Sequence, residues 1–204
     1  MILGIAVLLG PAARAAGTPA SPTILVLGDS LSAAYGIRVE QGWVALLQAR
    51  LRAKGYGHRV VNASSSGETT GGALARLPRA LSAHHPGIVI VELGANDGLR
   101  GLPVADIRAN LDAIIRNSQQ AGARILLVGM RIPPNYGPAY TADFHGVFVE
   151  LARRHKLPTV PFLLEDMALD EDMFQEDGLH PTAAAQPVLL DTVWPHLEPL
   201  LRRK

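Results

Sequence analysis

The sequence predicts a single α/β domain with a central parallel sheet. Strand-like apolar runs alternate with segments of helical period from residue 23 onward, which is the order that builds β-α-β units. The first run, TILVL at 23–27, has no alternating polar positions, as expected of a strand covered on both faces. The 204 residues suit one substantial core, and no linker, repeat or low-complexity tract divides them.

Five strands are expected in this sheet. In chain order they lie at 23–27, 59–63, 88–93, 124–130 and 159–163. The run IVIVEL at 88–93 is the strongest strand signal, and TVPFL at 159–163 predicts a short strand. Parallel strands need long crossover connections, so helices are expected between them.

The helices follow from apolar periodicity and from glycine or proline at their ends. After Gly42, a helix places Trp43, Leu47 and Leu51 on one face, and Gly55 follows where glycine favours the turn that closes a helix. Further helices are expected at about 69–85, where Pro78 would interrupt or kink the chain, at 104–121, at 141–156 and in the terminal region.

Residues 1–16 have the pattern of a secretory signal peptide. The apolar stretch ILGIAVLLG is too short to span a bilayer, and small residues follow it. We expect cleavage near Ala15 or Ala16, which leaves 17–204 as one mature domain in the periplasm or outside the cell, without stable membrane insertion. Because no basic residue precedes the apolar stretch, an uncleaved tether and a misassigned start are the alternatives.

Composition argues against several classes of partner. With 19 basic and 18 acidic residues and 5% aromatics, nucleic acid is not an expected partner. The chain has no cysteine, which excludes disulfides and thiolate sites. No zinc-binding H-E-x-x-H, dinucleotide-binding G-x-G-x-x-G or P-loop occurs, so neither a metal nor a cofactor is expected. The expected partner is a small-molecule substrate, and the expected state is a monomer.

Residues whose side chains could take part in a reaction lie directly after the predicted strands. Strand 23–27 leads into Gly28-Asp29-Ser30, the second into NASSSGETT with Gly67, and the third into GAND with Asn96. Ligands of such sheets bind outside the carboxyl ends of the strands, so these segments should meet. A later loop, DGLH, supplies Asp177 and His180.

Together these residues are the parts that acyl transfer needs. Ser30 is the candidate nucleophile, His180 its base, and Asp177 the carboxylate that orients the imidazole. The oxyanion donors would be the backbone N–H groups of Ser30 and Gly67 and the side-chain amide of Asn96.

Each of these residues also has an ordinary structural interpretation. A serine or asparagine after a strand is usually a turn former, and only the combination favours catalysis for Ser30 and Asn96. Asp29 is interpreted as a support for the serine loop, and Asp97 is left unassigned. The other histidines, such as His84 and His85, suit surface or capping positions.

The blocks GDSLS, NASSSGET, GAND and DGLHP resemble the four signature blocks of the SGNH (GDSL) hydrolase superfamily, in the same order. The resemblance extends from about residue 23 to about 200. It implies a flavodoxin-like three-layer α/β/α fold, with Ser30, Asp177 and His180 as a catalytic triad and Ser30, Gly67 and Asn96 as the oxyanion hole. It also implies cofactor-free hydrolysis of carboxylic esters and acyl thioesters, of the arylesterase, acyl-CoA thioesterase or lysophospholipase type.

The resemblance further implies an acyl crevice beneath the segment DGLRGLP at 97–103. The candidate lining residues are Leu99, Leu102, Ile132 and Pro133. Two alternatives are kept: a carbohydrate O-acetyl esterase, which the same blocks could serve, and a non-catalytic protein that binds acyl chains or lipids.

Overall fold

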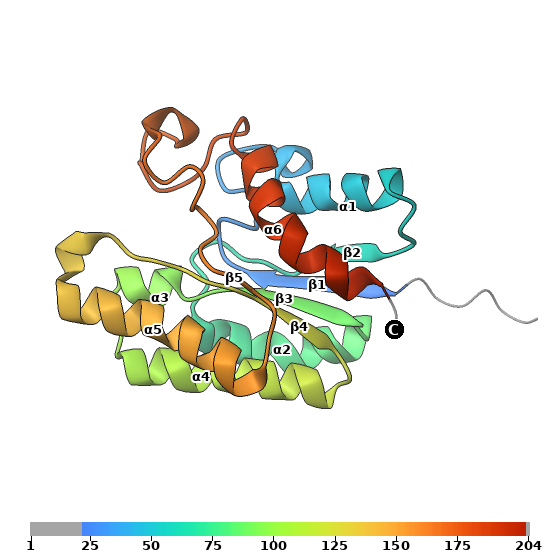
Figure 1. The fold of residues 1–204 in the computed structure, drawn as a ribbon, viewed down its shortest axis with the longest axis horizontal. Coiled ribbons are helices and arrows are strands. Elements are labelled where there is room, and N and C mark those ends of the chain that lie inside the picture. Colours follow the sequence, from blue (N-terminus) through green and yellow to red (C-terminus); the bar gives the residue numbers. More distant parts are fainter. Residues whose placement is uncertain (1–21, 203–204) are drawn as a thin grey trace, which may run out of the picture.

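A parallel sheet of five strands forms the centre of the protein, in the order β2-β1-β3-β4-β5 (Figure 1). The computed structural model describes residues 22–202, so the predicted signal peptide at 1–16 lies outside the described residues. The strands are β1 (Thr23–Gly28), β2 (Arg59–Asn62), β3 (Ile88–Glu92), β4 (Arg124–Val128) and β5 (Thr159–Val160). All adjacent strands are parallel, and their order is that of the flavodoxin-like doubly wound fold. The predicted α/β fold class is confirmed.

Helices cover both faces of the sheet and complete a three-layer α/β/α arrangement. Figure 1 shows α1 and α6 on one face and α2, α4 and α5 on the other. The helices are α1 (Trp43–Ala53), α2 (Thr70–His84), α3 (Ala95–Leu99), α4 (Val104–Gln120), α5 (Pro138–His155) and α6 (Gln186–Leu201), with short 3₁₀ turns η1 (Val39–Gln41), η2 (Pro134–Tyr136) and η3 (Glu171–Met173).

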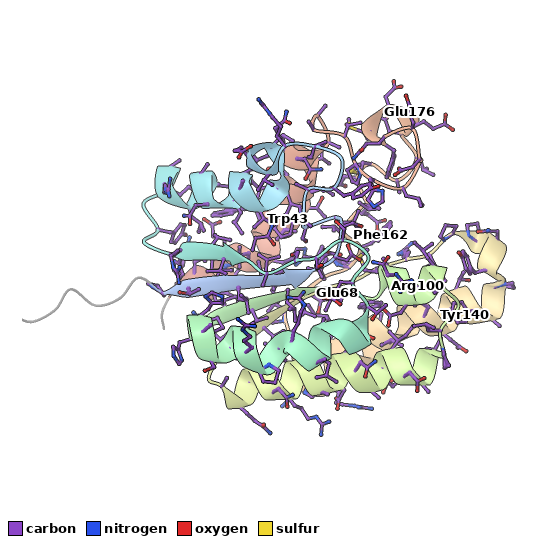
Figure 2. All side chains as sticks on the ribbon, turned by 180° about the vertical axis from the view of Figure 1, so that it is seen from behind. Trp43, Glu68, Arg100, Tyr140, Phe162 and Glu176 are labelled. Atoms are coloured by element: carbon purple, nitrogen blue, oxygen red, sulfur yellow. The ribbon has the colours of Figure 1, made fainter. Side chains whose placement is uncertain are left out.

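The core lies between the sheet and its two helical layers. Every residue of β1 and β3 is buried, which explains why their sequences show no polar alternation. Trp43 of α1 lies fully buried between its helix and the sheet (Figure 2). On the other face, the rings of Phe144 and Phe148 of α5 pack edge to face, with centroids 5.5 Å apart.

Prolines have different effects in two of the predicted elements. Pro78 does not interrupt the helix α2, because the sheet and α4 support it although one backbone hydrogen bond is lost. The strand β5 ends at Val160, before the predicted end at 163, because Pro161 has no N–H for the ladder. The prediction of Gly55 after α1 agrees with its left-handed φ of +78°.

Candidate active site

The carboxyl ends of β1 and β3 and the loop before α6 bring the predicted site residues to one end of the sheet. Ser30 lies in a turn after β1, in which the N–H of Ala33 donates to the carbonyl of Asp29 at 2.9 Å and that of Tyr35 to the carbonyl of Ser30 at 3.2 Å. Arg100 and Phe162 mark this end of the molecule in Figure 2. The turn places the hydroxyl of Ser30 in the region where ligands of this fold class bind.

A continuous chain of hydrogen bonds joins Asp177, His180 and Ser30. The Nε2 atom of His180 lies 2.9 Å from the Oγ atom of Ser30, and its Nδ1 atom lies 2.6 Å from the Oδ2 atom of Asp177. The predicted nucleophile and base, 150 positions apart in the sequence, are therefore in direct contact, and the predicted orienting residue contacts the base.

Asp177 is held in its ionised form. Its carboxylate accepts the backbone N–H of His180, the ring of His180 and the backbone N–H of Leu179, and these hydrogen bonds lower the pKa of Asp177 to about 2. An ionised carboxylate at Nδ1 holds the proton of the imidazole there. The Nε2 atom is then the acceptor that faces the hydroxyl of Ser30.

Two residues that the sequence analysis did not single out hold the His180 loop against the serine turn. The side-chain amide of Gln175 donates to the carbonyls of Tyr35 and Pro181, at 2.9 and 3.0 Å, and its backbone N–H donates to the carbonyl of His180 at 2.8 Å. The ring of Tyr35 packs on the imidazole of His180, with centroids 4.3 Å apart. Glycine is favoured at position 36, because its φ is +73° and a Cβ atom there would displace the side chain of Gln175.

The predicted oxyanion donors come from three separate segments of the chain, two loops and the short helix α3. In residues 22–202, no hydrogen bond uses the backbone N–H of Ser30 or of Gly67, so both remain available to a ligand. Asn96 lies in α3, which begins after Gly94 at a φ of +111°, and its side-chain amide donates to Asp29 Oδ2 at 3.2 Å. Ser30 and Asn96 line the cavity described below, whereas Gly67 is not among its lining residues.

Asp97, which the sequence left unassigned, joins the loop of Gly67 to the loop of Asn96. Its carboxylate accepts the backbone N–H of Thr70 at 2.9 Å and the hydroxyl of the same residue at 2.6 Å. Asp97 is 2% exposed, so these contacts are shielded from water. The first turn of α2 and the start of α3 are thereby fixed to each other.

An apolar cavity of about 480 Å³ opens beside Ser30 and His180. Three of the four predicted crevice residues, Leu99, Ile132 and Pro133, line it. Leu102 does not; it is 37% exposed, and its carbonyl accepts the hydroxyl of Tyr140. Much of the remaining wall comes from the segment 162–179, which contributes Phe162, Leu164, Ala168, Phe174, Gly178 and Leu179.

A buried glutamate beneath the serine turn was also missed. Glu92 ends β3, opposite Gly28 of β1, and is fully buried. The one available signal was an acid in the otherwise apolar run IVIVEL, which strand periodicity alone does not explain.

The fold and this hydrogen-bonded chain beside an apolar cavity have the arrangement of an acyl hydrolase. The sequence matches the GDSL-like Lipase/Acylhydrolase family over residues 26–187. It is 51% identical to "Esterase TesA" of Pseudomonas aeruginosa over 89% of this chain and 90% of that protein. It is 41% identical to "Thioesterase 1/protease 1/lysophospholipase L1" of Escherichia coli K12, over 89% and 86%.

Solved structures agree with these sequence matches. The crystal structure of the psychrotrophic esterase EstA from Pseudoalteromonas sp., inhibited by monoethylphosphonate, is 44% identical and superposes with a TM-score of 0.83, over 89% of this chain and 99% of that one. The chain belongs to the GDSL-like lipase/acylhydrolase family. The predicted membership of the SGNH (GDSL) superfamily and the predicted class of ester-bond hydrolase are confirmed.

Proposed function

We propose that this protein is a serine esterase in which Ser30 is the nucleophile, His180 the general base and acid, and Asp177 the residue that orients His180. The observation that carries this proposal is the unbroken chain from Asp177 Oδ2 through His180 to Ser30 Oγ at 2.6 and 2.9 Å, next to an apolar cavity. A serine hydroxyl becomes an effective nucleophile when an oriented imidazole accepts its proton.

The reaction proceeds through an acyl-enzyme. Ser30 Oγ attacks the acyl carbonyl while His180 Nε2 takes its proton, and the carboxylate of Asp177 stabilises the imidazolium. The N–H groups of Ser30 and Gly67 and the amide of Asn96 donate to the oxyanion. His180 then returns the proton to the leaving alcohol or thiol, and a water molecule, activated by the same imidazole, releases the acid.

The substrates are carboxylic esters and acyl thioesters whose acyl chain occupies the cavity. The apolar wall formed by Leu99, Ile132 and Phe162 favours a hydrocarbon chain over the sugar of a carbohydrate O-acetyl ester. The names of the relatives, which include "Arylesterase" of Vibrio mimicus at 43% identity, support the same substrate classes. A protein that only binds lipids would have no use for the ordered contacts of His180 with Ser30 and Asp177.

Export is part of the proposal. The apolar and small residues of 1–16 support a signal peptide, with the domain 17–204 released into the periplasm or the medium as a monomer. Within residues 22–202, no helix has the length and apolar character needed to cross a membrane.

Stopped-flow hydrolysis of p-nitrophenyl esters tests the proposal. The wild type should release a burst of p-nitrophenol equal to the enzyme concentration, and Ser30→Ala should release none. Ser82→Ala, which removes an exposed hydroxyl on α2, is the matched control and should behave as the wild type. Equal turnover by Ser30→Ala and the wild type would refute the role of Ser30. A panel that varies acyl length and leaving group independently then ranks the substrates.

A further inference from the structure

Two carboxyl groups lie buried directly beneath the proposed nucleophile. Asp29 is 1% exposed and Glu92 is fully buried. No Lys, Arg or His forms an ion pair with either group in the part of the chain that the structure describes. A pair of buried acids without a cation is costly, so its retention calls for a physical reason.

The pair fixes the backbone on both sides of Ser30. The Oε2 atom of Glu92 accepts the hydroxyl of Ser32 at 2.6 Å and the backbone N–H of Asp29 at 3.3 Å. The Oδ1 atom of Asp29 accepts the backbone N–H of Leu31 at 3.0 Å. The backbone N–H groups of the residues before and after Ser30 are therefore both bonded to the carboxyl pair. The N–H of Ser30 itself stays free for a ligand.

The same pair extends to the proposed oxyanion donor. The Oδ2 atom of Asp29 accepts the side-chain amide of Asn96 at 3.2 Å. Since the amide has two N–H groups, one can be held by Asp29 while the other faces the cavity that Asn96 lines. One network thus connects the nucleophile turn to the side chain that would stabilise the oxyanion.

If Glu92 is protonated, two negative charges do not have to lie side by side in this network. Burial, together with the negative charge of Asp29, raises the pKa of Glu92 well above its ordinary range, which favours the neutral carboxylic acid. Its side chain is also hydrogen-bonded to that of Asp29. A neutral acid at position 92 has an O–H that can be donated to the carboxylate of Asp29 while its Oε2 atom accepts from Ser32.

Gly28 makes the room that this arrangement needs. It pairs with Glu92 across β1 and β3, and a Cβ atom at position 28 would lie 2.6 Å from Glu92 Oε2 and 2.8 Å from Ser32 Oγ. The glycine before Asp29-Ser30 is therefore explained by the buried glutamate rather than by backbone conformation.

We propose that Glu92 is a positioning residue, which holds the Ser30 turn and the Asn96 amide in their reactive arrangement through Asp29 and Ser32. This inference rests on the proposed function and adds a residue that does not touch the substrate. Misplacing reacting groups by about 1 Å costs on the order of 10²-fold in rate.

Steady-state kinetics of Glu92→Ala and Glu92→Gln test this role. Glu92→Ala removes every contact and should lower kcat for a p-nitrophenyl ester by about 10²-fold while KM stays within about threefold, because the cavity wall is unchanged. Glutamine can accept from Ser32 and donate to Asp29, as the neutral acid does, so Glu92→Gln should restore kcat to within about fivefold of the wild type. Full kcat in Glu92→Ala, or equal impairment of both variants, would overturn the proposal.

Two further measurements keep the test decisive. If Glu92→Ala does not fold, Ser32→Ala replaces it and should lower kcat about tenfold, whereas Ser118→Ala, which removes a buried hydroxyl of α4, should leave kcat unchanged. Equal kcat in the two serine variants would overturn the role of Glu92. Labelling with a fluorophosphonate, located by mass spectrometry, separates the two proposals: a wild type that is not labelled at Ser30 refutes the proposed function itself.

Discussion

The buried acid Asp29 should make the protein less stable at neutral pH than at weakly acidic pH. Burial is the main reason that the pKa of Asp29 rises from the ordinary 3.8 to about 6, although hydrogen bonds from Leu31, Glu92 and Asn96 act in the opposite direction. To test this, the pH is varied and the stability of the wild type is compared with that of Asp29→Asn. The variant has no ionisable group at position 29.

The sign follows from which state holds the proton. Below about pH 4, the folded and unfolded chains both hold it, and Asp29 adds no pH dependence. Between about pH 4 and pH 6, the unfolded chain has released the proton while the folded chain keeps it, so the free energy of unfolding falls as pH rises. At 1.36 kcal/mol for each pH unit, the loss is about 3 kcal/mol once the pH exceeds about 6.

Urea unfolding at several pH values from 4 to 7.5 measures this effect. The free energy of unfolding of the wild type, minus that of Asp29→Asn, should fall by roughly 2 to 3 kcal/mol across this range. The pH dependence of this difference removes the contribution of titrating groups that do not interact with Asp29, and a pH-independent loss of hydrogen bonds in the variant only offsets the curve. Ser118→Ala, which changes no ionisable group, should give a curve parallel to the wild type. A parallel curve for Asp29→Asn as well would refute a raised pKa for Asp29.

Three further predictions concern the triad, the cavity and the core. Asp177→Asn should lower kcat by roughly 10⁴-fold, because the amide favours the wrong tautomer of His180; a loss under tenfold would contradict the orienting role. In Gly98→Ala, the new Cβ would lie 2.7 Å from the Cγ2 of Ile132 on the cavity wall, so kcat/KM for octanoyl esters should fall about tenfold relative to acetyl esters; an unchanged ratio would contradict this. Leu126 of β4 is fully buried, so Leu126→Ala should lower the free energy of unfolding by about 2–5 kcal/mol in urea titrations.

The strands of the sheet could be predicted well, because the signal for each strand lies within its own few residues. A strand buried on both faces, such as β1 or β3, shows as an uninterrupted apolar run. The short helix α3 was not predicted, since the five residues ANDGL carry no helical period and their conformation depends on Gly94 and on contacts with other segments. Likewise, the continuity of α2 through Pro78 depends on packing that a single helix does not reveal.

The site divides in the same way. The placement of Ser30, Asn96 and His180 at one end of the sheet could be predicted because each follows a recognisable strand end or turn, and the doubly wound topology brings such positions together. Gln175 and Glu92 could not, because their roles come from contacts with residues 140 and 60 positions away, Tyr35 and Ser32. Their own sequence neighbourhoods, an acidic loop and an apolar strand, suggest a solvated side chain and a core position instead.

The chemistry of position 92 limits what could replace the glutamate. A leucine of similar size would leave the hydroxyl of Ser32 and the N–H of Asp29 without their acceptor, and each buried unpaired donor costs about 1–3 kcal/mol. An ionised acid would place a second negative charge beside Asp29. Only a neutral group with both an acceptor and a donor satisfies Ser32 and Asp29 together, and among the natural side chains of this length these are protonated glutamate and glutamine. The turn that carries Ser30 is therefore shaped from the strand beneath it, by the acceptor that Glu92 presents to Ser32 and to the backbone of Asp29.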